Sequence, residues 1–436
     1  MVNVEDDETR LMRLQREVHR LRTSPSLRLG SHLTNAIRHP WRAPFLLVTL
    51  PWMMLIIGFE LLGWKAQPAA FATNEVGRPK AKGDCVVMFP TNGVGFGHFT
   101  RLLAVAKRMK EKQPSLEIIF FTTMPTLHLL KPYGIPAHHI AGPKYFKGMG
   151  TDEWNALLEE QLHVCLEIHR PSMFVFDGAF PYRGMLRAIQ GRRTLRKIWL
   201  RRGTFRKGSS IPVDSIQHFD ILIHPEDSTP SSYDEFDHGL EVVTCPPIVM
   251  LDDRELLSRR EARSRLGLPA DARVVYVQLG AGEINDIESD VRLTLEALLE
   301  EPDVYVVLGE SLLGERMRID MPRLLILRDY PNSMYFKGFD ATVQAGGYNS
   351  FHETRSFGLP TLFYPNMNTG MDDQVARCKA AEDEGWGIVL THRSAESIFR
   401  ACKKLIERPE VTPAVNCLNG ANKIAAYLLG ELNEFN

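Results

Sequence analysis

The sequence predicts an α/β protein with two doubly wound domains, each built on a parallel sheet, after a helical N-terminal extension. Short apolar runs alternate with helical patterns in two consecutive series, which is typical of parallel strands covered on both faces. A glycine-rich turn follows the first strand of the first series, and another ends a late strand of the second series. Because open sheets of this class bind ligands at the carboxyl ends of their strands, we expect these turns to line a cleft between the domains.

Composition limits the classes of protein that remain. The chain has 436 residues, enough for two or three domains. Its 44% hydrophobic and 24% charged residues are typical of globular proteins. The formal net charge of −1 argues against a surface that binds nucleic acid throughout. The six cysteines lie far apart without a C-x-x-C pair, which favours reduced thiols in the cytosol over a disulfide framework or a zinc site.

Residues 1–24 predict an amphipathic helix. Apolar residues recur at spacings of three and four among charged ones: Leu11, Leu14, Val18 and Leu21. This stretch is too short to be a stable coiled coil by itself. Residues 8–22 are therefore either a seam between two copies or a helix packed on its own protein. Because the first 22 residues are polar and rich in arginine, we expect no cleavable signal peptide.

Residues 25–66 contain the most apolar run of the chain, at positions 43–64. As a straight helix this run would be about 33 Å long, enough to cross a bilayer core of about 30 Å. Pro51 at its middle would kink a helix, and arginines and tryptophans lie before and along it as in interface anchors. We expect an interfacial or re-entrant element over a complete span, with a buried core helix as the alternative. Residues 67–83 predict a linker.

Two strand series follow the linker and define two domains. The first, at 85–89, 116–122, 172–176, 197–200 and 220–224, predicts a domain over residues 84–248. The second, at 273–279, 304–308, 324–327, 341–344, 361–364 and 387–390, predicts a domain over residues 249–436. Helical patterns separate most of the runs, so each domain should be Rossmann-like.

The first glycine turn contains Gly93, Gly95 and Gly97 and opens a predicted helix. Such glycines let the backbone approach a ligand, and a helix N-terminus offers free amides. The spacing differs from that of dinucleotide sites. His98, at the mouth of the turn, is a candidate general base or else a residue that caps the helix. Asp177, at a strand end facing the same cleft, either orients His98, acts as the base itself, or only forms a turn.

The second glycine turn belongs to a longer motif. Gly346 and Gly347 end a strand, and Asn349 and Ser350 open a helix whose N-terminus is suited to an anion. Glu353 follows one helical turn later on the same face, where a carboxylate could take both hydroxyls of a ribose. Asp373 and Gln374 follow the next strand at the sheet edge that binds ligands, with Asp372 as an alternative to Asp373. A diphosphate, a ribose and a further polyhydroxylated group would meet these residues in that order.

The run G-G-Y-N-S-x-x-E, then G-x-P, then P, then D-Q resembles the donor-binding signature of inverting GT-B glycosyltransferases. It is similar to the motif of plant UDP-glycosyltransferases and of the bacterial N-acetylglucosaminyltransferase that completes lipid II. The resemblance implies that Gly347, Asn349 and Ser350 hold the donor diphosphate, Glu353 the ribose, and Asp373 and Gln374 the transferred sugar. It also implies a second phosphate loop at Gly280 and Gly282 and a contact of Tyr330 with the base.

An inverting transfer needs a base for the acceptor hydroxyl and positive groups or amides for the leaving diphosphate. Ala345 stands where retaining GT-B enzymes usually carry a Glu, which favours inversion. His98 is our first choice for the base. No His, Cys or Asp cluster has metal-ligand spacing, and helix dipoles can replace a metal at the diphosphate, so we expect no cofactor and no essential metal.

Residues 192–208 form a basic run with interleaved aromatic side chains and no acidic residue. We expect it to form a basic surface through Arg196, Arg201, Arg202 and Arg206. Anionic lipid, a phosphate-bearing acceptor and RNA all fit such a surface, and the apolar segment in the same half favours lipid or a lipid-linked acceptor over a soluble one. We expect no nucleic-acid partner. Residues 1–213 carry a net charge of +15 and residues 214–436 a net charge of −16. This polarity predicts a chain that orients on an anionic membrane through its first half.

The sequence thus favours an enzyme at the cytosolic face of the cell membrane. It would transfer a sugar from a nucleotide-sugar donor, most simply a UDP-sugar, to a lipid-linked or cell-surface glycan. A nucleotide-sugar 2-epimerase on the same fold and a non-catalytic nucleotide-sugar-binding subunit are the alternatives.

Overall fold

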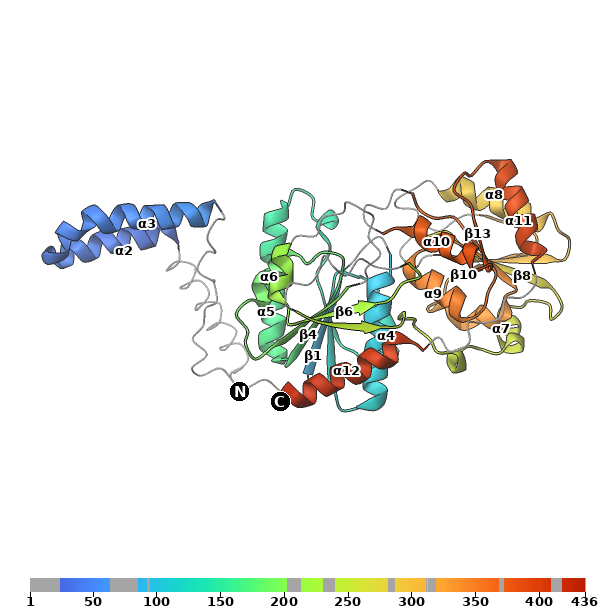
Figure 1. The fold of residues 1–436 in the computed structure, drawn as a ribbon, viewed down its shortest axis with the longest axis horizontal. Helices are drawn as coiled ribbons and strands as arrows, with labels where there is room; N and C mark the ends of the chain where they lie inside the picture. Colours follow the sequence, from blue (N-terminus) through green and yellow to red (C-terminus); the bar gives the residue numbers. More distant parts are fainter. Residues whose placement is uncertain are drawn as a thin grey trace, which may run out of the picture. The chain divides into compact units, whose positions relative to one another are not determined.

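The computed structural model describes residues 24–62, 85–91, 95–201, 213–229, 240–280, 287–310, 312, 319–367, 372–408 and 418–435. The chain divides into two compact units, Met1–Pro79 and Lys80–Asn436 (Figure 1). The predicted helix over residues 8–22 lies outside the described residues, as does the linker over 67–83.

The described part of the first unit is a helical hairpin. Helix α2 (Pro25–Arg38) is followed by the 3-10 helix η1 (Pro40–Phe45) and by α3 (Leu46–Leu61), which continues through its internal proline. The Nη1 of Arg28 lies 2.6 Å from Oε2 of Glu60, and a histidine–threonine hydrogen bond also joins the two helices. Because only 7% of the Glu60 side chain is exposed, this ion pair fixes how the two helices pack.

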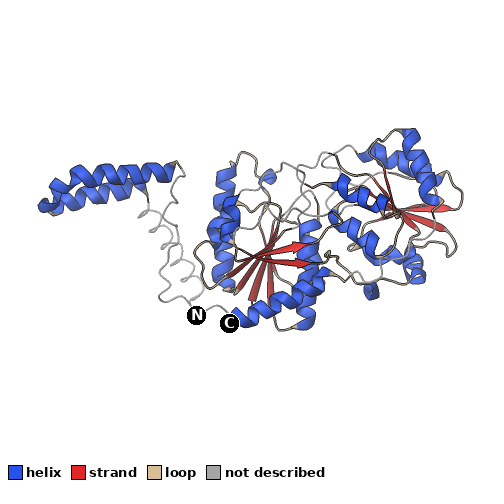
Figure 2. Ribbon diagram, viewed as in Figure 1, coloured by secondary structure: helices blue, strands red, loops and turns tan. Residues whose placement is uncertain are grey.

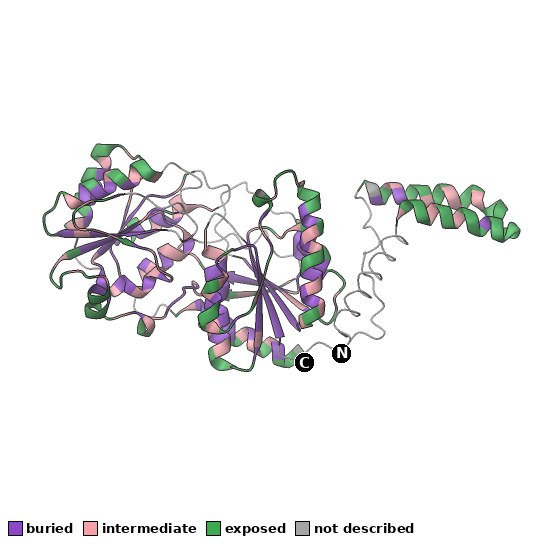
Figure 3. Cartoon of the chain, turned by 180° about the vertical axis from the view of Figure 1, so that it is seen from behind, coloured by how far each residue is buried: buried purple, intermediate pink, exposed green. Residues whose placement is uncertain are grey.

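The hairpin exposes much of its apolar surface to solvent (Figure 3). Large apolar side chains that are more than half exposed lie along η1 and α3: Trp41, Phe45, Leu47, Val48, Trp52 and Met54. By length and composition, Pro40–Glu60 is the one helical segment among the described residues that could cross a membrane. Only 11% of its most apolar stretch is buried, so α3 is not a buried core helix of this unit.

The first domain is built on a parallel sheet of seven strands in the order β3-β2-β1-β4-β5-β6-β7. Its strands are β1 (Cys85–Pro90), β2 (Glu117–Thr122), β3 (Ala137–His139), β4 (Met173–Asp177), β5 (Arg196–Leu200), β6 (Ile221–Pro225) and β7 (Glu241–Cys245). The helices α4 (Gly97–Lys112), α5 (Thr151–His169) and α6 (Arg183–Ile189) cover its faces (Figure 2). Every residue of β1 and β4 is buried, as expected for central parallel strands.

The second domain repeats this plan with six parallel strands in the order β10-β9-β8-β11-β12-β13. They are β8 (Arg273–Gln278), β9 (Val304–Gly309), β10 (Leu324–Leu327), β11 (Ala341–Gln344), β12 (Thr361–Phe363) and β13 (Gly387–Val389). Its helices are α7 (Arg259–Arg265), α8 (Ile287–Leu299), α9 (Tyr348–Ser356), α10 (Gln374–Asp383) and α11 (Ala395–Ile406). Short 3-10 segments complete the described fold: η2 (Leu127–Tyr133), η3 (Pro143–Tyr145), η4 (Val213–His218), η6 (Asp253–Glu255) and η7 (Asn332–Gly338).

The last helix, α12 (Gly420–Phe435), leaves the second sheet and packs beside α4 and β7 of the first domain (Figure 1). Its buried Ile424, Leu428 and Leu432 share one apolar cluster with α4. Arg196 of β5 pairs with Glu431 of this helix at 3.0 Å. The C-terminal segment that we placed in the second domain therefore ties the chain back to the first.

All eleven predicted strands are present within one or two residues of the expected positions. The sequence missed β3 and β7, which lie at the two edges of the first sheet. Edge strands bury less surface, and β3 is three residues long while β7 is largely exposed, so neither has an apolar run.

Candidate active site

The centre of the site is a pair of side chains from α4 and β4. His98 is the second residue of α4, and Asp177 is the last residue of β4. Their Nδ1 and Oδ1 atoms lie 2.6 Å apart. The Nη2 of Arg101 also lies 2.7 Å from this Nδ1. Because the ionised carboxylate can only accept, we assign the proton of Nδ1 to the bond with Asp177, and Nη2 then donates to the same carboxylate. This assignment leaves the lone pair on Nε2. The histidine side chain is 14% exposed and the aspartate side chain 1% exposed, so only the histidine is open to a substrate.

Arg101, which the sequence did not single out, contacts both members of this pair. Its Nε donates to Oδ2 at 3.0 Å and its Nη2 donates to Oδ1 at 2.7 Å. Burial alone would raise the pKa of Asp177, but the Arg101 charge and the contacts with His98 lower it overall. The carboxylate is therefore ionised, buried and fully engaged, which suits a group that orients His98 rather than one that takes the proton itself.

The second glycine turn lies against this cluster. Gly346 has a φ of +76°, which glycine adopts freely, and a Cβ there would meet the Cys378 thiol. Gly347 is the N-cap of α9, and Asn349 and Ser350 occupy its first turn. A glycine cap leaves the first amides of the helix without a side-chain acceptor from the cap residue, which is the arrangement of an anion site.

Asn349 joins the two domains at this point. Its Oδ1 accepts from Nη1 of Arg101 at 3.3 Å, and its Nδ2 donates to the carbonyl of Gly97 at 3.2 Å. The first turn of α9 therefore lies beside the first turn of α4, and the guanidinium of Arg101 lies next to both. The structure thus brings the two predicted glycine turns together. Gly95 precedes α4, whereas Gly93 lies outside the described residues.

Glu353 lies one turn further along α9 and is only partly exposed. Its Oε1 accepts from Ser333 Oγ at 3.1 Å, the one side-chain hydrogen bond to it that the described residues provide. Burial raises the pKa of Glu353 to about 7, and the bonds from Ser333 and the backbone of Met250 offset only part of that effect. A ligand that donates hydrogen bonds to this carboxyl group would stabilise its ionised form and so lower its pKa.

The remaining predicted donor residues are distributed around the same sheet edge. Tyr330 donates to or accepts from Thr100 of α4 at 2.9 Å, and its ring lies 5.7 Å from that of Phe96. Gly280 follows β8 with a φ of +102°, and Gly282 lies outside the described residues.

Asp373 and Gln374 lie at the start of α10. Asp373 caps this helix by accepting from the Ala376 amide at 3.0 Å. Gln374 Oε1 accepts from the Asn366 amide at 3.0 Å. Asp372, the alternative to Asp373, instead pairs with Arg377 at 2.6 Å.

A second buried ionic cluster, also missed from the sequence, connects the domains. Arg377 of α10 is fully buried and pairs with Asp227, which follows β6, at 2.7 Å. His352 of α9 contacts the same aspartate at 3.0 Å. The ring of Tyr348 lies between Arg101 and Arg377, 5.4 and 5.7 Å from the two guanidinium carbons. These contacts hold the first turn of α9 against the first domain.

Of the expected basic surface, the structure describes Arg196 and Arg201, and neither forms an unpaired, exposed basic patch. Arg201 is only 2% exposed and lies 5.0 Å from the ring of Trp199, and burial lowers its pKa to about 9. Arg201 directly follows the interior strand β5 and is itself buried, so it does not contribute to an exposed basic surface. Arg196 pairs with Glu431 and Glu241, which neutralise it. Arg202 and Arg206 lie outside the described residues.

Comparisons with known proteins find similarity to glycosyltransferases. No protein-family model matches the chain. It is 24% identical over 166 residues to the UDP-N-acetylglucosamine–N-acetylmuramyl-(pentapeptide) pyrophosphoryl-undecaprenol N-acetylglucosamine transferase of Aquifex aeolicus. That match covers 36% of this chain and 46% of the relative, so it spans less than half of that relative's length. The enzyme of the same name from Clostridioides difficile is 22% identical over 340 residues, 73% of this chain and 81% of the relative.

Among solved structures, the kitacinnamycin glycotransferase superposes with a TM-score of 0.55 at 15% identity, covering 81% of this chain and 100% of that chain. The predicted fold of two Rossmann-like domains in the GT-B arrangement is therefore confirmed. The resemblance to glycosyltransferases that the motif indicated is also confirmed, as a similarity to enzymes of this kind.

Proposed function

We propose that the chain is an inverting glycosyltransferase that moves a sugar from a UDP-sugar to a lipid-linked acceptor at the cytosolic face of a membrane. The observation that carries this proposal is the His98–Asp177 pair, held by Arg101 beside the N-terminus of α9. A base and a diphosphate-binding helix end are the two groups that such a transfer needs on opposite sides of the reacting carbon.

In this reaction His98 acts as the general base. Its Nε2 takes the proton of the acceptor hydroxyl as the oxygen forms a bond to the anomeric carbon. The bond from that carbon to the diphosphate breaks, and its electron pair leaves with the diphosphate, so the anomeric configuration inverts. Asp177 keeps the proton on Nδ1 and stabilises the imidazolium that forms.

Negative charge on the leaving diphosphate would be met by the first amides of α9, while the guanidinium of Arg101, buried and paired with Asp177, would act only through its longer-range charge. The Arg101 charge lies beside the first turn of this helix through Asn349. A helix N-terminus and an arginine can stabilise a diphosphate without a divalent cation. We therefore propose that transfer needs no bound metal at this site.

The donor would lie along the second domain. Ser350 and Asn349 would contact the diphosphate and Glu353 the ribose, while Gln374 and the carboxylate at 372 or 373 would contact the sugar. Asp373 is the better of the two for the sugar, because Asp372 is paired with a buried arginine. UDP is favoured as the nucleotide because both transferases compared above name a UDP-sugar.

A lipid-linked acceptor is supported by the first unit. Its hairpin exposes tryptophan, phenylalanine and leucine side chains that would be unfavourable in water and suit a membrane interface. The names of the two relatives specify a substrate linked to pyrophosphoryl-undecaprenol, and undecaprenol is a lipid. An excess of 15 positive charges in residues 1–213 would add attraction to anionic headgroups.

The proposal is tested with the purified full chain and a panel of UDP-, GDP- and TDP-sugars. Calorimetry should find one nucleotide sugar that binds, and adding a polyprenyl-diphosphate-linked glycan should yield a product whose anomeric configuration is inverted by NMR. His98→Asn should lose the transfer activity. His128→Asn, a change at an exposed histidine of the same domain, is its matched control and should leave the rate unchanged.

Two results would redirect the proposal. Release of the free sugar with its C2 configuration inverted, without any acceptor, would identify a 2-epimerase. Donor binding without turnover on any lipid-linked or soluble glycan acceptor would identify a binding subunit.

A further inference from the structure

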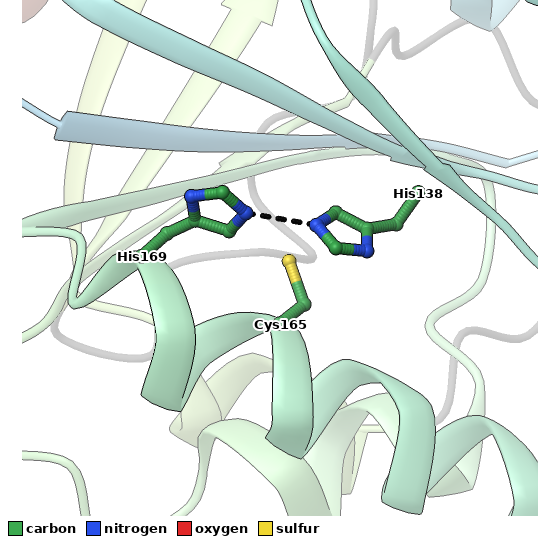
Figure 4. Close-up of side chains that lie close together, drawn as sticks. All are labelled: His138, Cys165 and His169. Atoms are coloured by element: carbon green, nitrogen blue, oxygen red, sulfur yellow. Dashed lines mark hydrogen bonds between the residues drawn. The ribbon is translucent and has the colours of Figure 1, made fainter. Parts of the chain in front are cut away.

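Three potential metal ligands converge on the covered face of the first sheet, among residues that the proposed reaction does not use. Cys165 and His169 lie four residues apart in the last turns of α5, and His138 lies on the neighbouring edge strand β3. The Sγ of the cysteine and one nitrogen of each histidine all lie within 4.8 Å of one another, and the three side chains point to one centre (Figure 4).

The two histidines meet through the atoms that bind metals. Their Nε2 atoms lie 2.8 Å apart, and the rings are edge to face with centroids 5.0 Å apart. Without an ion, one of the two nitrogens must carry a proton to make this contact. Around a tetrahedral Zn²⁺ with bonds of about 2.0–2.3 Å, neighbouring ligand atoms lie about 3.5 Å apart. To reach that spacing, the two Nε2 atoms would have to move apart by less than about 1 Å.

An independent contact orients His169 for such a role. Its Nδ1 lies 3.5 Å from Oε1 of Glu117, the first residue of β2. The charge of this carboxylate would favour a proton on Nδ1, and the lone pair of Nε2 would then face the cluster. This carboxylate–histidine arrangement accompanies most histidines that bind metals.

Access to the cluster is from one side, because the Cys165 side chain is fully buried. Both histidines are partly exposed, which gives an ion a route to the cluster from solvent.

We propose that His138, Cys165 and His169 bind one Zn²⁺ ion, with a water molecule as the fourth ligand. Two imidazoles and a thiolate form a ligand set that Zn²⁺ accepts and that alkaline-earth ions do not favour. The ion would link the short edge strand β3 to the end of α5 and so stabilise this edge of the sheet. Binding would transfer the thiol proton to solvent, so it releases about one proton per ion.

The experiment uses the full chain after dialysis against a chelator. Titration with Co²⁺ should give one equivalent of binding with a near-ultraviolet sulfur-to-cobalt charge-transfer band, and Zn²⁺ should displace it. Zn²⁺ should also raise the melting temperature of the chain. Cys165→Ala and His169→Gln should each abolish the charge-transfer band or weaken Co²⁺ binding by at least about tenfold.

Two matched variants control for the other thiols and imidazoles of the chain. Cys402→Ala removes a buried cysteine of the second domain, and His128→Asn removes an exposed histidine of the first. Both should bind Co²⁺ as the unmodified chain does. If Cys165→Ala does not fold, His138→Asn, at a partly exposed position, provides the same test.

The proposal would be overturned by an unmodified chain that binds no Co²⁺ through sulfur. It would also be overturned if His138→Asn and His169→Gln retained full affinity. Neither readout depends on sugar transfer, so these results are independent of the proposed enzymatic function.

Discussion

Replacing Glu353 by glutamine should make the folded protein more stable and its donor binding weaker. The carboxyl group of Glu353 lies on α9 and accepts a hydrogen bond from the hydroxyl of Ser333. Burial raises its pKa to about 7. Ionisation in the folded state is therefore unfavourable until a ligand donates hydrogen bonds to the carboxylate. Glutamine removes the charge and retains the shape.

The size of the stability effect follows from the two pKa values. The gap between the ordinary glutamate value of 4.5 and about 7 corresponds to about 3 kcal/mol at most. Because the folded-state value is the higher one, the unfolded chain loses its proton first as the pH rises. The destabilising contribution is absent below pH 4.5, grows between 4.5 and about 7, and is complete above about 7.

Donor binding should show the opposite dependence. A ribose that donates both hydroxyls needs the ionised carboxylate, so affinity of the unmodified chain should fall by up to about tenfold per pH unit below 7. The Glu353→Gln variant should bind the donor about 30–100-fold more weakly at pH 8, as expected for lost charge-assisted hydrogen bonds. Its residual affinity should not vary over the same pH range.

Urea unfolding from pH 5 to pH 8.5 measures the first effect and calorimetry with the donor measures the second. The difference in unfolding free energy between the variant and the unmodified chain should grow by about 2–3 kcal/mol over this range. Glu396→Gln, at a side chain that is 85% exposed, should show no such growth. A difference that stays constant with pH would refute the raised pKa, and unchanged donor affinity would refute the ribose contact.

Three further changes test the packing and the membrane hairpin. Arg377→Met should lower the unfolding free energy by about 3–5 kcal/mol, because Asp227 stays buried without its arginine. Adding Asp227→Asn should recover part of this loss in urea titrations, and no recovery would contradict the pairing. Gly346→Ala should cost about 1–3 kcal/mol because of its positive φ and a buried thiol beside it, whereas Gly347→Ala should cost less than about 1. Equal melting temperatures of the two glycine variants would contradict this reasoning. Deleting residues 1–79 should stop the chain from sedimenting with anionic vesicles while it still binds the donor, and a deleted chain that still sediments would contradict the membrane role.

The sequence was informative wherever one local pattern determines the structure. Central parallel strands are continuous apolar runs, so their positions followed from composition and glycine punctuation. The turn before His98 and the motif around Asn349 were visible for the same reason, because glycines and a following helix have a fixed spacing. The edge strand β3 has no such signal.

Contacts between distant segments could not be predicted in the same way. An arginine in a helix is usually solvated, so Arg101 and Arg377 gave no signal until the fold placed aspartates from other segments beside them. Arg101 was within reach of the sequence, since it lies three residues after His98 on the same helix face. Arg201 of the basic run is the converse case. It directly follows strand β5 inside the sheet, and its burial depends on segments distant in the sequence.

The central claim is that His98, oriented by Asp177, takes the proton of the acceptor in a sugar transfer. The most direct test is the single-turnover rate of transfer by His98→Ala at a donor concentration that calorimetry shows to be saturating. The account predicts a rate at least about 100-fold below that of the unmodified chain, with donor affinity within about threefold. A variant that transfers the sugar at the unmodified rate would contradict it.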